Sequence, residues 1–156
     1  GLGGDDSIRS NGGNDVVDGG RGNDTIFGGS GDDIIDGGEG DDEIIGGLDN
    51  DVLNGGFGND IINGGDGDDV ISGGPGSDVL TGGMGSDRFI YELGDLETVD
   101  LITDFVSGID TIIIQGVGSD AKVEYDATTG LVSVDGQAFL QLDPGLSVDD
   151  DDFTIM

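Results

Sequence analysis

The sequence predicts an all-β protein, a parallel β-solenoid with a small antiparallel β cap at its carboxy-terminal end. Three observations lead to this prediction: a nine-residue period over residues 1–90, an apolar residue once in every period, and 35 glycines among 156 residues. So much glycine excludes helices from the repeats, because glycine costs about 1 kcal/mol per position in a helix. We expect two units, the repeats at 1–90 and a capping region at 91–156.

Residues 1–90 form ten consecutive blocks of nine residues without insertion or deletion, such as GGSGDDIID and GGFGNDIIN. We number the places of each block from one to nine. The first six places are rich in glycine and predict a turn, and the last three predict a short strand with an apolar side chain at place eight. This side chain points opposite to its neighbours, so it should face inward. Two blocks then make one coil of a solenoid with about five coils and two parallel sheets.

Place six of every block is an aspartate. These residues are Asp6, Asp15, Asp24, Asp33, Asp42, Asp51, Asp60, Asp69, Asp78 and Asp87. Stacked coils would bring their carboxylates into columns near the inter-strand distance of about 4.8 Å, where bare charges repel one another. We therefore expect a cation between them. Calcium suits the position because it takes about six to eight oxygen ligands from carboxylates and backbone carbonyls, whereas magnesium requires a tighter octahedron and retains waters.

The composition excludes several classes of function. Thirty-five acidic residues against four basic ones give a formal charge of −31, which repels nucleic acid and anionic membrane surfaces. The chain has neither cysteine nor histidine, so disulfides, thiolate metal sites, H-E-x-x-H zinc sites and histidine-based triads are excluded. No apolar run is long enough for a membrane helix, and no nucleophile-elbow, dinucleotide or phosphate-loop motif is present.

Paired carboxylates could also serve a glycosidase, because that chemistry needs only two acids. Here the acids fall in repeat places or in turns of the capping region, which favours structural and calcium-binding roles. We expect no catalytic residues and no enzymatic activity in this chain itself.

The blocks resemble the calcium-binding nonapeptide repeats of RTX (repeats-in-toxin) proteins, G-G-x-G-x-D-x-U-x, in which U is apolar. The resemblance implies a right-handed parallel β-roll with calcium between turns of adjacent coils on the same side, at most about eight ions. The implied ligands are the place-six aspartates and backbone carbonyls of the turns. Those at place four belong to Gly22, Gly31, Gly40, Gly58, Gly67, Gly76 and Gly85. Asp49 replaces this glycine in the sixth block, and aspartate tolerates the left-handed region better than most residues.

From Tyr91 onward the period stops. The stretches at 87–91, 100–105 and 108–114 resemble the segment that closes RTX β-rolls, which implies a terminal calcium site with Asp100, Asp104 and Asp110. The alternative is that these three are acids of surface turns. Alternating segments at 122–126, 131–134 and 138–142, separated by turn residues, predict hairpins of a small antiparallel sheet packed on the last coil.

Two further features each have a functional and a structural interpretation. The acidic run 149–152 and the mostly apolar tail Phe153–Met156 resemble the uncleaved signal of type I secretion substrates. The tail could equally form a last strand with Phe153 and Ile155 facing the core. Place seven of the even blocks carries an outward apolar row, either simply exposed or a docking face. Its members are Val16, Ile34, Val52 and Val70.

We expect a calcium-binding module that folds on binding calcium and serves export, located at the carboxy terminus of a larger secreted bacterial protein. The chain opens on Gly1 within a repeat, which favours a piece of something larger. The expected partners are calcium ions, an upstream domain and the type I secretion machinery, and the expected location is extracellular. The alternative is a calcium-rigidified structural or adhesive module that binds saccharide or protein at the cell surface.

Overall fold

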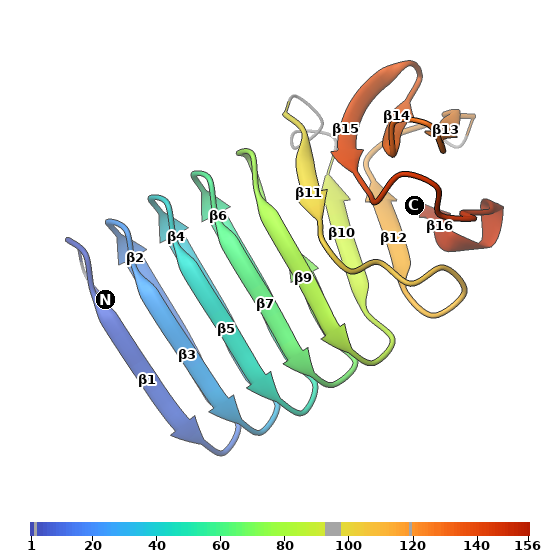
Figure 1. Ribbon diagram of the computed structural model, residues 1–156. Helices are drawn as coiled ribbons and strands as arrows, with labels where there is room; N and C mark the ends of the chain where they lie inside the picture. The colour runs from blue at the N-terminus through green and yellow to red at the C-terminus, as the bar shows by residue number, and fades with distance from the viewer. Residues whose placement is uncertain (2, 93–97, 119) are drawn as a thin grey trace.

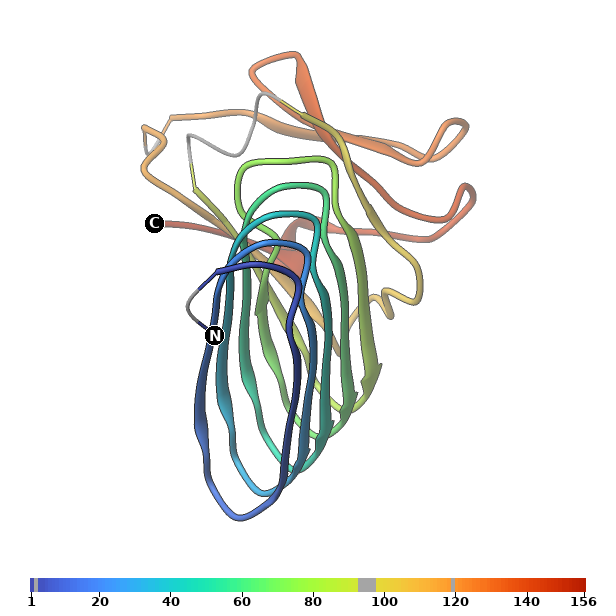
Figure 2. The same cartoon turned by 90° about the vertical axis from the view of Figure 1, so that its left-hand side faces the viewer.

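The computed structural model describes residues 1, 3–92, 98–118 and 120–156. They form a parallel β-solenoid with antiparallel strands toward the carboxy-terminal end, so the predicted fold class is confirmed (Figure 1). Seen along the axis, the repeats are flattened coils stacked one behind another, with the amino-terminal coil nearest the viewer (Figure 2). Among the described residues, no helix is long and apolar enough to cross a membrane.

Two sheets form the long walls of the coils. Counted over the described residues, the first sheet has nine strands, in the spatial order β1 (Ser7–Gly12), β3 (Thr25–Ser30), β5 (Glu43–Leu48), β7 (Ile61–Asp66), β9 (Val79–Met84), β11 (Asp100–Ile102), β15 (Gln137–Gln141), β14 (Leu131–Val134) and β13 (Val123–Asp126). In the same part of the chain, the second sheet has seven, in the order β16 (Phe153–Ile155), β12 (Thr111–Gln115), β10 (Arg88–Glu92), β8 (Val70–Ser72), β6 (Val52–Phe57), β4 (Ile34–Glu39) and β2 (Val16–Arg21). A short 3₁₀ helix, η2 (Asp150–Asp152), precedes β16.

The strand register confirms that two blocks make one coil. Ser7 pairs with Thr25, and Thr25 pairs in turn with Glu43, in steps of 18 residues. Odd blocks therefore build the first sheet and even blocks the second. Residues at the same place of successive coils lie side by side, which arranges equivalent side chains in columns across each sheet.

Most repeat strands are longer than predicted, with six residues instead of the three at places seven to nine. Each continues through the two glycines of the next block to its place-three residue. The reason is steric: a Cβ on Gly37, or on Gly38 with its φ of 110°, would come closer than 3.0 Å to a backbone oxygen of a neighbouring coil. The sequence predicts a turn at these glycines, whereas in the structure they allow close stacking of strands.

Place-eight side chains form the core between the two sheets, as predicted. They are buried from Val17 to Phe89, and Ile8 is partly buried. The core continues beyond the repeats, where Tyr91 packs edge-on against Phe139 with ring centroids 5.1 Å apart. The repeats and the residues that follow them therefore share one hydrophobic core.

The parallel ladders continue past residue 90, where the nine-residue period ends. Strand β11 pairs with β9 and β12 pairs with β10, and β15 and β16 extend the two sheets in parallel. The predicted hairpins are present as the antiparallel strands β13, β14 and β15. They do not form a separate sheet packed on the last coil, because β15 joins the first sheet through β11. The division into two units at residue 90 stays a prediction.

Candidate metal centre

The place-six aspartates form two columns, one from the odd blocks and one from the even blocks. From Asp24 onward they are buried. The Oδ1 of each accepts a hydrogen bond from the backbone N–H of the aspartate one coil earlier, as Asp42 does from Asp24 at 2.7 Å. These bonds measure 2.7–3.0 Å and run through Asp6, Asp24, Asp42, Asp60, Asp78 and Asp100 in one column, and through Asp15, Asp33, Asp51, Asp69, Asp87 and Asp110 in the other. Each carboxylate thus binds the backbone of the preceding coil.

Many of the second carboxylate oxygens in these columns have no hydrogen-bond donor, although Asp110 Oδ2 accepts from Val106 N–H at 2.8 Å. Seven such Oδ2 atoms are both buried and without a partner within the described part of the chain, those of Asp15, Asp24, Asp33, Asp42, Asp51, Asp60 and Asp69. From Asp24 onward, each of these oxygens lies beside the place-one glycine of its own block. A Cβ on Gly37 would come closer than 3.0 Å to Asp42 Oδ2 and also to the carbonyl oxygen of Gly55 in the next coil. Carboxylate and carbonyl oxygens therefore converge here with no N–H or O–H group to bind them. Such a group of oxygens is what a hard cation such as calcium requires as ligands.

The electrostatics of the columns also favour a cation. The pKa of Asp60 is raised to about 7, mainly by burial and also by the charges of Asp78 and Asp42, although the N–H of Asp42 opposes the shift. Burial likewise raises the pKa of Asp51 and of Asp87 to about 6, again with contributions from column neighbours. A bound cation would allow these stacked, buried carboxylates to stay ionised. The columns therefore favour carboxylates with calcium beside them over ionised carboxylates without a cation.

The place-four residues lie in the turns, and all of them except Gly76 have backbone conformations that favour glycine. Positive φ angles of 104–149° occur at Gly22, Gly31, Gly40, Gly58, Gly67 and Gly85. Asp49 takes the same place with a φ of 75°, as its tolerance of the left-handed region predicts. A Cβ on Gly40 or Gly76 would come closer than 3.0 Å to the carbonyl oxygen of the place-four glycine one coil earlier. The turns are thus stacked closely, and the role of their carbonyls as ligands stays a prediction.

The structure does not gather the three acids predicted for a terminal site in one place. Asp100 extends the odd column, with its Oδ1 accepting from Asp78 N–H at 2.9 Å, and Asp110 extends the even column below Asp87 at 3.0 Å. Asp104 instead binds strand β9, since its oxygens accept from Gly82 N–H at 2.9 Å and from Gly83 N–H at 2.8 Å. Asp104 is close enough to raise the pKa of Asp110, after burial as the main cause. The structure therefore brings Asp104 and Asp110 together and places Asp100 on the other side.

Asp152 is a further buried acid near Asp110, and it was not among the predicted site residues. Its oxygens accept from Ser107 Oγ and Gly108 N–H at 2.8 Å and from Asp149 N–H at 2.9 Å. Burial alone would raise its pKa, but these donors hold the pKa below the usual value. Asp152 thus ties η2 to the turn before β12. No signal in the sequence distinguishes it from its three acidic neighbours.

Carboxylates alone do not make a metal site. Within the described residues, no group of three or more acidic side chains is placed to hold one ion. A cation between two turns would therefore need backbone carbonyls in addition to one or two aspartates. This requirement agrees with the convergence of carboxylate and carbonyl oxygens beside the place-one glycines.

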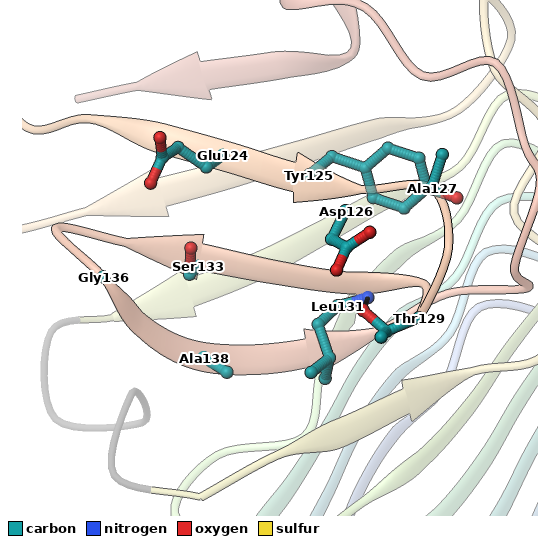
Figure 3. A pocket seen from close by; sticks show the side chains of 9 residues that line it. All are labelled: Glu124, Tyr125, Asp126, Ala127, Thr129, Leu131, Ser133, Gly136 and Ala138. Atoms are coloured by element: carbon teal, nitrogen blue, oxygen red, sulfur yellow. Dashed lines mark hydrogen bonds between the residues drawn. The ribbon is translucent and has the colours of Figure 1, made fainter.

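The outer face of β13, β14 and β15 carries an open cavity of about 570 Å³ (Figure 3). Its acids are engaged locally: Glu124 pairs with Lys122, and Asp126 accepts the N–H of Thr128 at 2.9 Å. That hydrogen bond is the main cause of the lowered pKa of Asp126. The cavity therefore lacks the donor-free buried oxygens that distinguish the place-six columns.

Place five is a second position with a regular series of hydrogen bonds, and it was not among the predicted site residues. Its side chains accept hydrogen bonds from the backbone of the adjacent coil, as Asn50 does from Asp68 N–H at 2.7 Å. The signal was present in the sequence, because place five is aspartate or asparagine in the first eight blocks. These residue types accept backbone hydrogen bonds readily in turns.

Comparison with known proteins identifies the repeats. A search of curated proteins finds no match. The solution structure of the AlgE6R3 subunit from the Azotobacter vinelandii mannuronan C5-epimerase is 20% identical, with 99% of this chain and 80% of that chain covered and a TM-score of 0.41. A TM-score this low supports no inference. The family of the RTX calcium-binding nonapeptide repeat matches four times, at residues 1–26, 18–53, 27–62 and 63–95. Since these matches cover more than half of its residues, the chain belongs to the RTX calcium-binding nonapeptide repeat family.

Proposed function

We propose that this chain is a calcium-dependent folding and export module of a larger secreted protein. The matched repeats are a calcium-binding structural module, not a catalytic one. The observation that carries the proposal is the series of buried place-six Oδ2 atoms without a donor beside backbone carbonyls. The place-six aspartates and the carbonyls of the turn glycines would hold the ions, about eight in all. Calcium supplies the positive charge that the columns lack.

Coupling between calcium and folding follows from the charge. A chain with a formal charge of −31 and so many glycines has the composition of a disordered segment. The fold buries two columns of carboxylates, and this is unfavourable unless a cation accompanies them. The unfolded chain keeps these carboxylates hydrated and apart. Calcium that binds the folded state alone therefore shifts the equilibrium toward the β-solenoid.

Circular dichroism tests this coupling directly. We expect a disordered spectrum in chelator and a β spectrum after calcium is added, with a midpoint on the order of 10⁻⁴–10⁻³ M, as in extracellular calcium modules. Magnesium at the same concentration is the control and should fold the chain poorly, because it requires a tighter octahedron. A native β spectrum in chelator would contradict the proposal.

The export part of the proposal rests on this coupling and on the carboxy-terminal tail. RTX repeats are typical of secreted proteins, and calcium outside the cell would drive folding after passage of the unfolded chain. The tail forms β16, which pairs with β12, with Phe153 partly buried and Ile155 36% exposed. A strand in the folded state is compatible with a signal that is read in the unfolded chain.

Deletion of Phe153–Met156 separates the two roles of the tail. Loss of export with an unchanged calcium transition in the purified chain supports a signal. Unchanged export with a lower melting temperature leaves only the strand. The chain should be tested behind an upstream cargo domain in a host with a type I secretion system, and the undeleted chain is the control.

A structural or adhesive module is the second candidate. The observation that favours it is the outer row on the second sheet, where Val16, Ile34 and Val52 are 81%, 52% and 45% exposed. Apolar side chains in a row on an outer face are typical of contact surfaces. Threonine substitution of all three keeps the β-branched shape and should abolish surface attachment if this candidate is right. Unchanged attachment would remove the support for it.

A further inference from the structure

Place five forms its own ladder on the surface of the turns. In eight consecutive pairs, Oδ1 of the aspartate or asparagine accepts a hydrogen bond of 2.7–3.1 Å from the backbone N–H of the place-five residue in the following coil. The direction is opposite to that of place six, whose Oδ1 binds the preceding coil. Each inner turn is therefore hydrogen-bonded to the coil before it and to the coil after it.

The two ladders differ in how charged and neutral side chains follow one another along each column. Aspartate and asparagine alternate strictly at place five, in the order Asp5, Asn23, Asp41, Asn59 and Ser77 along one column and Asn14, Asp32, Asn50, Asp68 and Ser86 along the other. No two carboxylates are adjacent in either column. Asn59 Nδ2 even donates to Asp41 Oδ1 at 3.3 Å. Place six, by contrast, stacks a carboxylate on a carboxylate at every step.

We propose that the place-five residues are positioning residues, which tie successive turns together without a metal and so hold the place-six carboxylates in register for the cation. This rests on the proposed calcium function. An alternating column has no like charges in contact and therefore needs no cation to stack. A column made only of aspartates, as at place six, needs a cation to stack. One turn thus contains two neighbouring acidic positions with separate tasks, hydrogen-bonded stacking at place five and ion binding at place six.

Asp41 and Asp42 provide a matched pair for the first test, because they are adjacent in one turn and carry the same side chain. Asp41→Asn keeps the acceptor for Asn59 N–H and should leave the number of bound calcium ions unchanged in native mass spectrometry. Asp42→Asn also keeps its acceptor but removes a ligand charge, and it should lose at least one ion. Loss of an ion from Asp41→Asn would overturn the proposal, because place five would then bind metal.

Charge order gives the second test, read as melting temperature at a fixed, saturating calcium concentration. Asn59→Asp keeps the acceptor for Ser77 N–H but places two carboxylates in contact, and it should lower Tm by roughly 2–4 °C. The double variant Asp41→Asn/Asn59→Asp has the net charge of the parent and no adjacent pair, so it should regain the parent Tm. Asn63→Asp adds the same charge on an outer sheet face between Ile45 and Thr81 and is the control.

The proposal is overturned if Asn59→Asp and Asn63→Asp have the same Tm. It is also overturned if the Tm of the double variant is no higher than that of Asn59→Asp. A rise in Tm with an additional bound ion in Asn59→Asp also overturns it. Failure of the proposed function is a separate result, in which the parent chain binds no calcium by mass spectrometry. The order of the melting temperatures is then measured in chelator and still tests the place-five ladder.

Discussion

Removal of one buried charge should have opposite effects with and without calcium. Asp60 is suited to this perturbation because it lies in the middle of the odd column and is 1% exposed. Its Oδ1 accepts from Asp42 N–H at 2.8 Å, and its Oδ2 has no donor. Asp60→Asn keeps the shape and the Oδ1 acceptor, and it replaces the charged Oδ2 with a neutral amide NH2. The variant therefore removes the charge of one column member with little change in volume.

The magnitude follows from the pKa of this group. Burial is the main cause that raises it from 3.8 to about 7. At pH above 7 the ionised carboxylate therefore costs the calcium-free fold about 2–4 kcal/mol, the lower figure allowing for solvent screening. Asp60→Asn relieves this cost when no cation is present. With calcium bound, the same change removes a charged ligand and should destabilise the fold by a similar amount.

The assay compares two titrations for the parent and the variant. In chelator, trimethylamine N-oxide should fold Asp60→Asn at a lower concentration than the parent, as followed by circular dichroism. In saturating calcium, urea should unfold the variant at a lower concentration. Asp66→Asn removes the same charge from an exposed place-three position and should shift neither midpoint appreciably. A variant that is destabilised in both conditions would refute the reasoning, because the ionised Asp60 would then stabilise the fold by itself.

Three further predictions concern pH, turn geometry and position in the stack. Without calcium, the folded chain keeps a proton on Asp60 that the unfolded chain releases above pH 3.8, so the stability of the calcium-free fold should fall as pH rises from 3.8 to about 7. Folding induced by an osmolyte measures this, and a lower osmolyte midpoint at neutral pH than at pH 4 would contradict it. Gly40→Ala combines a φ of 136° with overlap of the new Cβ and the backbone of the preceding coil, and it should lower the free energy of unfolding in urea by about 3 kcal/mol or more. Gly136→Ala has open space around its Cβ and should lower it by about 1 kcal/mol. Equal losses would show that close stacking of the coils does not contribute. Asp42→Ala should raise the calcium midpoint for folding more than Asp6→Ala, since a central lesion interrupts the array and a terminal one shortens it, and equal midpoints speak against nearest-neighbour stacking.

The repeats were predictable from the sequence because their rules are local. An apolar residue every nine places, from Val17 to Phe89, can be buried in only one way when each strand exposes alternate side chains on opposite faces. The same period required Asp24, Asp42 and Asp60 to stack. Even the exception at Asp49 was predictable, since a single residue's tolerance of positive φ decides it. The charge columns therefore followed from spacing and residue type alone.

Tertiary structure decided what spacing could not. Asp100 and Asp110 join different columns at separations of 22 and 23 residues, because the ladders beyond residue 90 are set by strand pairing instead of by a repeat. The donor-free Oδ2 atoms and the inward place-one glycines likewise depend on how closely two coils approach. A nine-residue period determines which residues are equivalent. Only the packed coils determine which oxygen of an aspartate such as Asp42 accepts a backbone hydrogen bond and which has no donor.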